Sequence, residues 1–304
     1  MKSEVRFLHK FLKSIGVSEY TTTRKIQELV KDVIMNPESR NYTTLNGNED
    51  TVLVEFCKNF AENMGIAVCG EFDENDNFTF YYFYPYLRGT GVSSMEDVSV
   101  ERHAAKESYA GVCDDIKVGV TLIFYLQNMI PNIKYRNTDK LPVRGTSLTL
   151  SALGIQGSIM MPIIKSENQK KKIQQSTLTR NQLIEAARRG DEDAIESLTL
   201  EDMDTYTTIS RRIQKEDVFS LVDTYFMPYG VECDQYSVLG EITECHIVKN
   251  RLTEEEICVM TLNCNELSFD VCINVKDLFG EPKVGRRFKG VVWLQGAVNY
   301  PEQD

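Results

Sequence analysis

The chain has 304 residues, of which 42% are apolar and 26% charged, and its formal net charge is -11 at pH 7. Because one hydrophobic core rarely serves that many residues, we expect two or three domains. The acidic balance argues against broad contact with a nucleic-acid duplex, whose phosphates most of this surface would repel. No apolar run approaches the roughly 20 residues that a membrane-spanning helix needs.

The cysteines and the N-terminus indicate a compartment. The sequence holds eight cysteines and no CxxC pair. Lys10 and Lys13 interrupt the apolar positions at the N-terminus, which therefore lacks the apolar core of a signal peptide. Without an export signal we expect a cytoplasmic protein with reduced thiols rather than a disulfide framework.

The first half predicts an α+β domain, residues 1–165, with a mainly antiparallel sheet and helices. Apolar residues at helical spacing predict a helix ended by Gly16 and a second helix capped by the threonines Thr21–Thr23. The other predicted elements are a strand turning into a helix over 51–64, a hairpin of 66–72 and 78–87, a short helix over 100–109, a central strand over 117–128, and a second hairpin over 146–164 folded at Gly154.

The middle of the chain predicts a linker and a helical block, residues 166–230. The lysine-rich stretch 166–176 is typical of a linker. Gly190 is predicted to end one helix and Asp191 to cap the next, while residues 199–202 have the form of a capping box that opens a third. A fourth helix is predicted over 216–226.

Residues 231–304 predict a small β-barrel domain of the OB or SH3-like kind, with four or five short strands and one helical turn over 275–279. The predicted fold class is therefore α+β: an N-terminal sheet with helices, a central helical block and a C-terminal barrel.

The stretch Gly280–Gly296 combines a basic turn with an apolar strand that closes the predicted barrel. It holds four cations with no acid from the first to the last, and the only tryptophan of the chain. Arginine binds phosphate or carboxylate in a bidentate manner, and an aromatic side chain on a barrel face stacks on a base. Adjacent strand residues point to opposite faces, so these cations are not all expected to serve one ligand. The candidate binding residues here are Lys283, Arg286, Arg287, Lys289 and Trp293.

Two more candidate binding residues, Arg211 and Arg212, lie just upstream of the predicted barrel. An arginine motif beside a small barrel is similar to the arrangement in cyclic-dinucleotide receptors of the PilZ type. The companion Asp/Asn-x-Ser-x-x-Gly element of those receptors is absent from this sequence.

The basic turn has a second interpretation. Between Asp191 and Asp204 there are seven acids and no base. Pairing of the turn with this acidic run inside the chain, or simple solvation, explains the charges without any ligand.

Two clusters hold residue types that could form a chemical site. Cys245 and His246 lie among other cysteines, but zinc-knuckle spacing is absent, and small buried apolar residues are the favoured role of these thiols. His103 and Cys113 can be imagined as a nucleophilic pair, but the chain has no GxSxG, HExxH, Walker or GxGxxG pattern. We therefore predict no catalytic residue, no metal and no cofactor.

Long strings of the second half, among them LIEAARRGDEDAIESLTLEDMDTY and LFGEPKVGRRFKGVVWLQG, resemble a family of bacterial proteins of about this length. That family is catalogued as a domain of unknown function, mainly in anaerobic Gram-positive bacteria. The resemblance is strongest over 183–304 and implies an intracellular setting, but it carries over no active-site residue.

These observations favour a non-catalytic binding or adaptor protein that acts on an unknown protein partner or a small anionic ligand through the barrel and the acidic helices. The first alternative is binding of a nucleotide or single-stranded nucleic acid at the basic barrel edge. The second is an enzyme of unknown class in the N-terminal half, with His103 near its centre.

Overall fold

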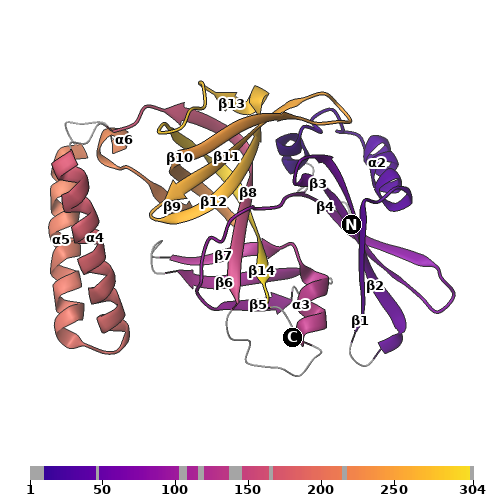
Figure 1. The fold of residues 1–304 in the computed structure, drawn as a ribbon, viewed down its shortest axis with the longest axis horizontal. Helices are drawn as coiled ribbons and strands as arrows, with labels where there is room; N and C mark the ends of the chain where they lie inside the picture. Colours follow the sequence, from indigo (N-terminus) through magenta and orange to yellow (C-terminus); the bar gives the residue numbers. More distant parts are fainter. Residues whose placement is uncertain are drawn as a thin grey trace.

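The computed structural model describes residues 10–45, 48–102, 108–115, 120–136, 146–163, 167–213 and 218–301. It is an α+β fold in which a four-stranded sheet and a larger, barrel-forming sheet lie side by side, with a helical hairpin next to the barrel (Figure 1). The predicted fold class is confirmed.

The two predicted N-terminal helices are confirmed. Residues 10–12 are helical and continue into the 3-10 helix η1 (Lys13–Ile15), which ends at Gly16 with a φ of 78°, a conformation that glycine adopts without steric cost. Helix α2 (Thr23–Met35) begins after Thr22, whose hydroxyl accepts a hydrogen bond from the Lys25 backbone N–H.

The smaller sheet is a fully antiparallel meander of β1 (Ser39–Leu45), β2 (Asn48–Ala61), β3 (Met64–Phe72) and β4 (Phe78–Leu87). The predicted hairpin of β3 and β4 is confirmed. The predicted helix toward Met64 is wrong, because β2 stays extended to Ala61. Phe56 and Phe60 are four residues apart, a spacing that fits one face of a strand as well as one face of a helix.

The barrel has five strands: β8 (Ser147–Met160), β10 (Gln235–Lys249), β11 (Glu256–Cys264), β12 (Leu267–Asn274) and β14 (Arg287–Asn299). Their order is β8-β12-β11-β10-β14, and pairing of β14 with β8 closes the ring. The predicted small barrel is thus confirmed, and it takes one strand from the segment before residue 165.

The second hairpin predicted over 146–164 is wrong, since β8 runs through Gly154 without a turn. Gly154 pairs with Ile273 of β12 and Val292 of β14, where the β14 register shifts. The glycine therefore marks a bulge between two partner strands rather than a reversal of the chain.

A second antiparallel unit of β5 (Val98–Arg102), β6 (Tyr109–Asp115) and β7 (Val120–Leu126) joins the barrel where β7 pairs with β14. The predicted central strand over 117–128 is confirmed in β7. The short helix predicted over 100–109 is wrong at both described ends, which are strands; residues 103–107 lie outside the described part. Four shorter elements complete the description: α3 (Met129–Arg136), β9 (Tyr225–Pro228), η2 (Val275–Asp277) and β13 (Leu278–Phe279). The turn η2 confirms the helical turn predicted over 275–279.

The helical block is a hairpin of α4 (Glu167–Arg188) and α5 (Glu192–Ile213), followed by α6 (Val218–Leu221). The predicted linker is wrong from Glu167 onward, where the chain is helical. Asp191 caps α5 as predicted, accepting from the Ala194 N–H at 3.1 Å. No new helix opens at Thr199, whose hydroxyl donates to the Ile195 carbonyl one turn earlier, inside α5. No described helix has the length and apolar character needed to cross a membrane.

Two hydrophobic cores hold these elements together. The first fills the barrel and continues beneath β6 and β7. The second lies between the smaller sheet, α2 and the outer face of the barrel. Successive residues of β14 alternate between them: Val292 and Leu294 face the first core and Trp293 the second.

Candidate binding surfaces

One acid partly neutralises the basic turn. Lys283 Nζ lies 2.9 Å from a carboxylate oxygen of Glu281, and Arg286 Nη1 lies 3.4 Å from the other. Hydrogen bonding from Lys283, aided by the nearby Arg286 charge, lowers the pKa of the Glu281 carboxyl. The acid that pairs with this turn is therefore its own neighbour Glu281 and not the acidic run 191–204.

Arg287 is an internal anchor. Its guanidinium is buried and donates to the carbonyl oxygens of Phe219 at 2.9 Å, Val222 at 2.9 Å and Met161 at 3.0 Å. Phe219 lies in α6 and Val222 directly follows it, at a helix end where backbone acceptors have no helical partner. Burial lowers the pKa of Arg287. The side chain thus fixes α6 to the barrel.

Lys289 contacts the same helix. Its ammonium lies 4.0 Å from the centre of the Phe219 ring, a cation–π contact. Arg287 and Lys289, two residues apart on β14, therefore both hold α6. Arg286, which lies just before β14, stays at the surface and pairs in the turn.

Trp293 does not present a stacking face to solvent. It is 1% exposed, packs against Phe11 and Tyr125 with ring centres 5.0 and 5.2 Å away, and donates from Nε1 to Asp234 at 2.7 Å. Tyr236, a second aromatic residue of the barrel, is also buried and exchanges hydrogen bonds with the backbone of Ile123. Stacking of a base on either ring is ruled out in this conformation.

The two upstream arginines lie in α5 rather than at the barrel strands. Arg211 is exposed near the end of the helix, and the side chain of Arg212 lies outside the described part. The predicted binding residues thus lie in four different places. Lys283 and Arg286 pair with Glu281, Arg287 and Lys289 contact α6, Trp293 is buried, and Arg211 and Arg212 lie near the end of α5. They do not converge on one ligand.

Comparison with known proteins gives one family. A family described as "Domain of unknown function, E. rectale Gene description (DUF3881)" matches residues 12–296. The chain belongs to the DUF3881 family. The match spans both sheets and the hairpin, so it extends the resemblance of the second half through the first. No curated protein and no solved structure matches the chain.

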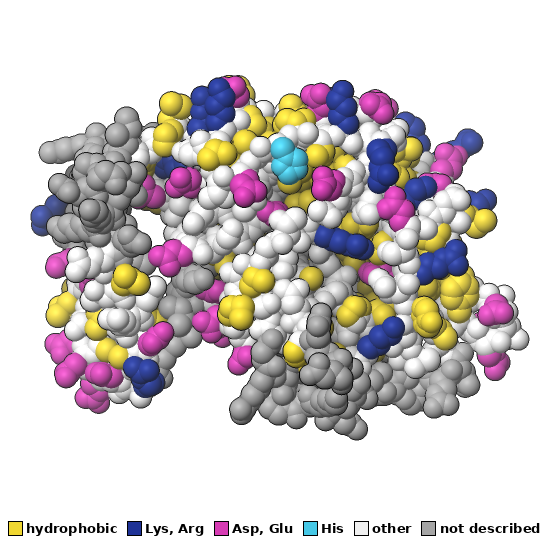
Figure 2. Space-filling model, viewed as in Figure 1, with side chains coloured by type: hydrophobic (Ala, Val, Ile, Leu, Met, Phe, Trp, Pro, Cys, Tyr) yellow, Lys and Arg dark blue, Asp and Glu magenta, His cyan; other side chains and the backbone are white. Residues whose placement is uncertain are grey.

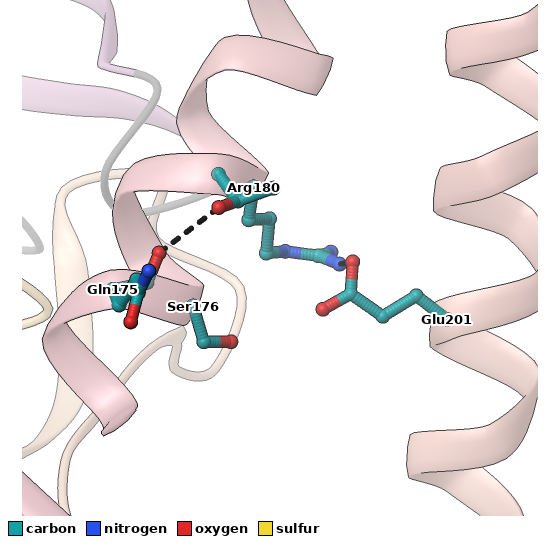
Figure 3. A pocket seen from close by; sticks show the side chains of 5 residues that line it. Gln175, Ser176, Arg180 and Glu201 are labelled. Atoms are coloured by element: carbon teal, nitrogen blue, oxygen red, sulfur yellow. Dashed lines mark hydrogen bonds and ion pairs between the residues drawn. The ribbon is translucent and has the colours of Figure 1, made fainter.

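The acidic run of this DUF3881 chain forms an exposed surface at the far end of the hairpin. Six of its seven acids are exposed, and Glu201 is half-buried. Arg180 of α4 reaches across to Glu201 of α5, with Nη1 3.3 Å from the carboxylate (Figure 3). Its Nη2 lies 2.7 Å from Asp202. This bridge crosses an open hollow of about 410 Å³ between the helices. Figure 2 shows hydrophobic and acidic side chains intermixed on the lower part of the hairpin.

The candidate catalytic cluster is only partly described. His103 lies outside the described residues. Cys113 is buried, and burial raises the pKa of its thiol to about 11, which opposes formation of the nucleophilic thiolate. Asp115 is buried and accepts a hydrogen bond from Ser94 at 2.6 Å. These two side chains serve the core of the β5–β7 unit.

The described cysteines behave as buried apolar residues with two exceptions. Cys233 is exposed and Cys245 half-buried, and the other six are buried. Burial raises the pKa of the Cys258 and Cys264 thiols to about 12. Within the described ranges, no group of three or more His, Cys, Asp or Glu side chains is arranged to hold a metal ion.

Sequence reasoning missed a cavity of about 310 Å³ beside β13. Its rim carries Phe279, which is 81% exposed and the most exposed of the large aromatic side chains in the described part of the chain. One signal was available: in the pair Leu278-Phe279 only one side chain can face the core if the segment is extended. The glycine that follows, Gly280, has a φ of 94° and turns the chain away directly after the exposed ring.

Proposed function

We propose that this protein is a non-catalytic cytoplasmic binding protein or adaptor whose main partner surface is the acidic hairpin of α4 and α5, with the barrel edge as a second contact. The observation that carries the proposal is the exposure of three large apolar side chains on the most acidic helix: Ile195 at 48%, Leu200 at 58% and Met203 at 63%.

These three residues share the side of α5 that faces away from α4. Ala194, which is buried, marks the side of α5 that packs on α4. At 100° per residue, Met203 lies opposite Ala194, and Ile195 and Leu200 flank it within about a quarter turn. The result is an outer helix face that exposes several apolar side chains among acids, and exposed apolar surface of this kind is typical of interaction sites.

The negative charge of the hairpin indicates the kind of partner that it would bind. Glu192 and Glu196 lie on the same outer face as Met203, and the run 191–204 contains no base. A cationic, amphipathic partner segment would bury the apolar residues and pair with the acids between them. A second copy of this chain, with its net charge of -11, is the less favourable occupant.

Two other observations support the barrel edge as a second contact and the cytoplasm as the compartment. Val284 and Lys283 of the basic turn are both well exposed, which gives this edge an apolar and cationic surface opposite in charge to the hairpin. Eight free cysteines, six of them buried, suit a reducing compartment.

A pull-down from lysate with matched variants tests the hairpin. One variant carries Ile195→Ser, Leu200→Ser and Met203→Ser; the control carries Met35→Ser, Met95→Ser and Val231→Ser, three apolar residues elsewhere that are even more exposed. We expect wild type and control to capture the same proteins, the hairpin variant to lose them, and added salt to weaken capture. Circular dichroism verifies that both variants keep their helices. Equal capture by the two variants refutes the role of the hairpin.

A further inference from the structure

Three segments distant in the sequence line the cavity beside β13. β13 itself lies at one end of the barrel, near the top of Figure 1. Lys13 comes from η1, and β8 supplies one wall. The turn η2 and β13 supply the other. The volume, about 310 Å³, lies at the lower end of the roughly 300–1,000 Å³ typical of small-molecule sites. The lining side chains that the argument uses are Lys13, Gln156, Ser158, Lys276, Asp277 and Phe279.

The walls are fixed by hydrogen bonds. Asn274 caps η2, accepting from the Lys276 N–H at 3.0 Å, and its amide donates to the Lys13 carbonyl at 3.2 Å. Ser14 donates to the Gly154 carbonyl at 2.7 Å and so ties η1 to β8. The cavity is therefore preformed and needs no rearrangement to accept a ligand.

Phe279 forms an aromatic rim. It pairs through its backbone with Ser158 of β8, while its neighbour Leu278 packs against the barrel core. A phenylalanine side chain that stays 81% exposed contributes little hydrophobic stabilisation to the fold. Stacking of a ligand ring on its face would bury that surface, and aromatic rings accept any base in this way.

Of the described cations beside the cavity, only one keeps donors for an anionic group. Lys13 is neutralised by Asp277 at 2.9 Å. Lys276 lies 3.6 Å from Glu255, a carboxylate that already accepts hydrogen bonds from Ser18 and Asn274. The Lys276 side chain is 69% exposed, so its ammonium retains donors for a ligand.

The neighbouring acids limit that ligand. Glu254 and Glu256, on either side of Glu255, are exposed beside Lys276. They disfavour a long nucleic-acid strand, whose further phosphates they would repel. In the cavity wall, Gln156 is exposed and Ser158 half-buried, and both offer donors and acceptors to a heterocycle edge.

We propose that this cavity binds a mononucleotide, with its base stacked on Phe279, its phosphate on Lys276, and its polar base edge facing Gln156 and Ser158. The site is separate from the hairpin, so its success or failure does not depend on the protein partner. It also uses none of the residues that the basic turn supplies.

Calorimetric titration with each of the four common ribonucleoside 5′-monophosphates tests the site. We expect at least one to bind, and the matching nucleoside and inorganic phosphate each to bind at least about tenfold more weakly, because stacking and the ion pair act together. Phe279→Ala and Lys276→Gln should each weaken binding at least about tenfold, since stacking of one base alone is worth about that factor. Phe80→Ala removes a half-exposed ring of β4 and should leave the affinity unchanged.

Thermal unfolding of each variant shows that the fold is intact, since both site residues are at the surface. Absence of heat with all four nucleotides at millimolar concentration overturns the proposal. So does binding that survives Phe279→Ala or Lys276→Gln, or binding lost equally in Phe80→Ala.

Discussion

Arg287 Nη2 donates to the Phe219 carbonyl oxygen at 2.9 Å, so a barrel strand satisfies a backbone acceptor of a helix 68 residues earlier in the chain. Arg286, the preceding residue, faces outward and pairs with Glu281. These two adjacent arginines thus have different roles: Arg287 is structural, whereas Arg286 lies in a solvated ion-pair cluster.

Replacing Arg287 should destabilise the protein, whereas replacing Arg286 should not. Arg287→Met keeps most of the side-chain volume but leaves carbonyls of α6 without donors, for which we expect a loss of about 2–4 kcal/mol in the free energy of unfolding. Arg286→Met removes an exposed ion pair worth at most about 1 kcal/mol. Urea unfolding of both variants measures the difference. Equal free energies of unfolding for the two would contradict the anchoring role.

The contrast also shows what the sequence could reveal. Alternation along β14 correctly separates inward from outward residues, but it does not say what lies on each side. Trp293 points out of the barrel, yet the smaller sheet and Phe11 cover it. That covering comes from residues far away in the sequence, Phe11 lying 282 positions before Trp293, for which local periodicity carries no signal.

The errors in predicting helices and strands from the sequence have local causes. Residues 167–176 are helical although they are polar, because a helix that needs no wide apolar face can have the composition of a linker. Gly154 looked like a turn because glycine serves bulges as well as reversals. The cavity at Phe279 was missed because its walls come from three segments that only the folded chain brings together.

Trp293 provides an optical test of the second core, because it is the only tryptophan. With 1% of its surface exposed, we expect blue-shifted emission and no quenching by iodide in the native state, with both features lost on unfolding. Trp293→Phe loses the hydrogen bond to Asp234, and we expect a cost of about 1–3 kcal/mol, since the acceptor is charged. Asp234→Asn keeps an acceptor and should cost less. Native emission that iodide quenches readily would show that the ring is not buried.

Glu55 should make stability depend on pH. It is 3% exposed, and burial raises the pKa of its carboxyl, although Tyr84 donates to it at 2.8 Å and Asn41 at 3.3 Å. The folded state therefore favours the protonated form. Its contribution to stability is complete below the ordinary pKa of 4.5 and is lost as the pH rises through the raised folded-state value.

Glu55→Gln removes this titration while keeping an oxygen for the Tyr84 hydroxyl. We expect the variant to gain stability relative to wild type as the pH rises from about 4.5, the ordinary carboxyl pKa, toward neutrality. Urea unfolding across this range measures the difference, with the exposed Glu74→Gln of the β3–β4 turn as control. A variant whose difference from wild type is constant with pH would contradict the assignment.

The cysteines should react in the order of their exposure. Cys233 is exposed, Cys245 is half-buried, and the other six are buried in the two cores. A thiol reagent reaches a buried sulfur only when the surrounding structure opens, so protection there reports on local unfolding. With a maleimide and intact-mass spectrometry, we expect one fast modification, a slower second, and six more only in denaturant. Cys233→Ser should abolish the fast phase and leave the others unchanged. Fast labelling of a core cysteine, or a native mass showing disulfide formation among them, would contradict both the packing of the two cores and the reduced state of these thiols.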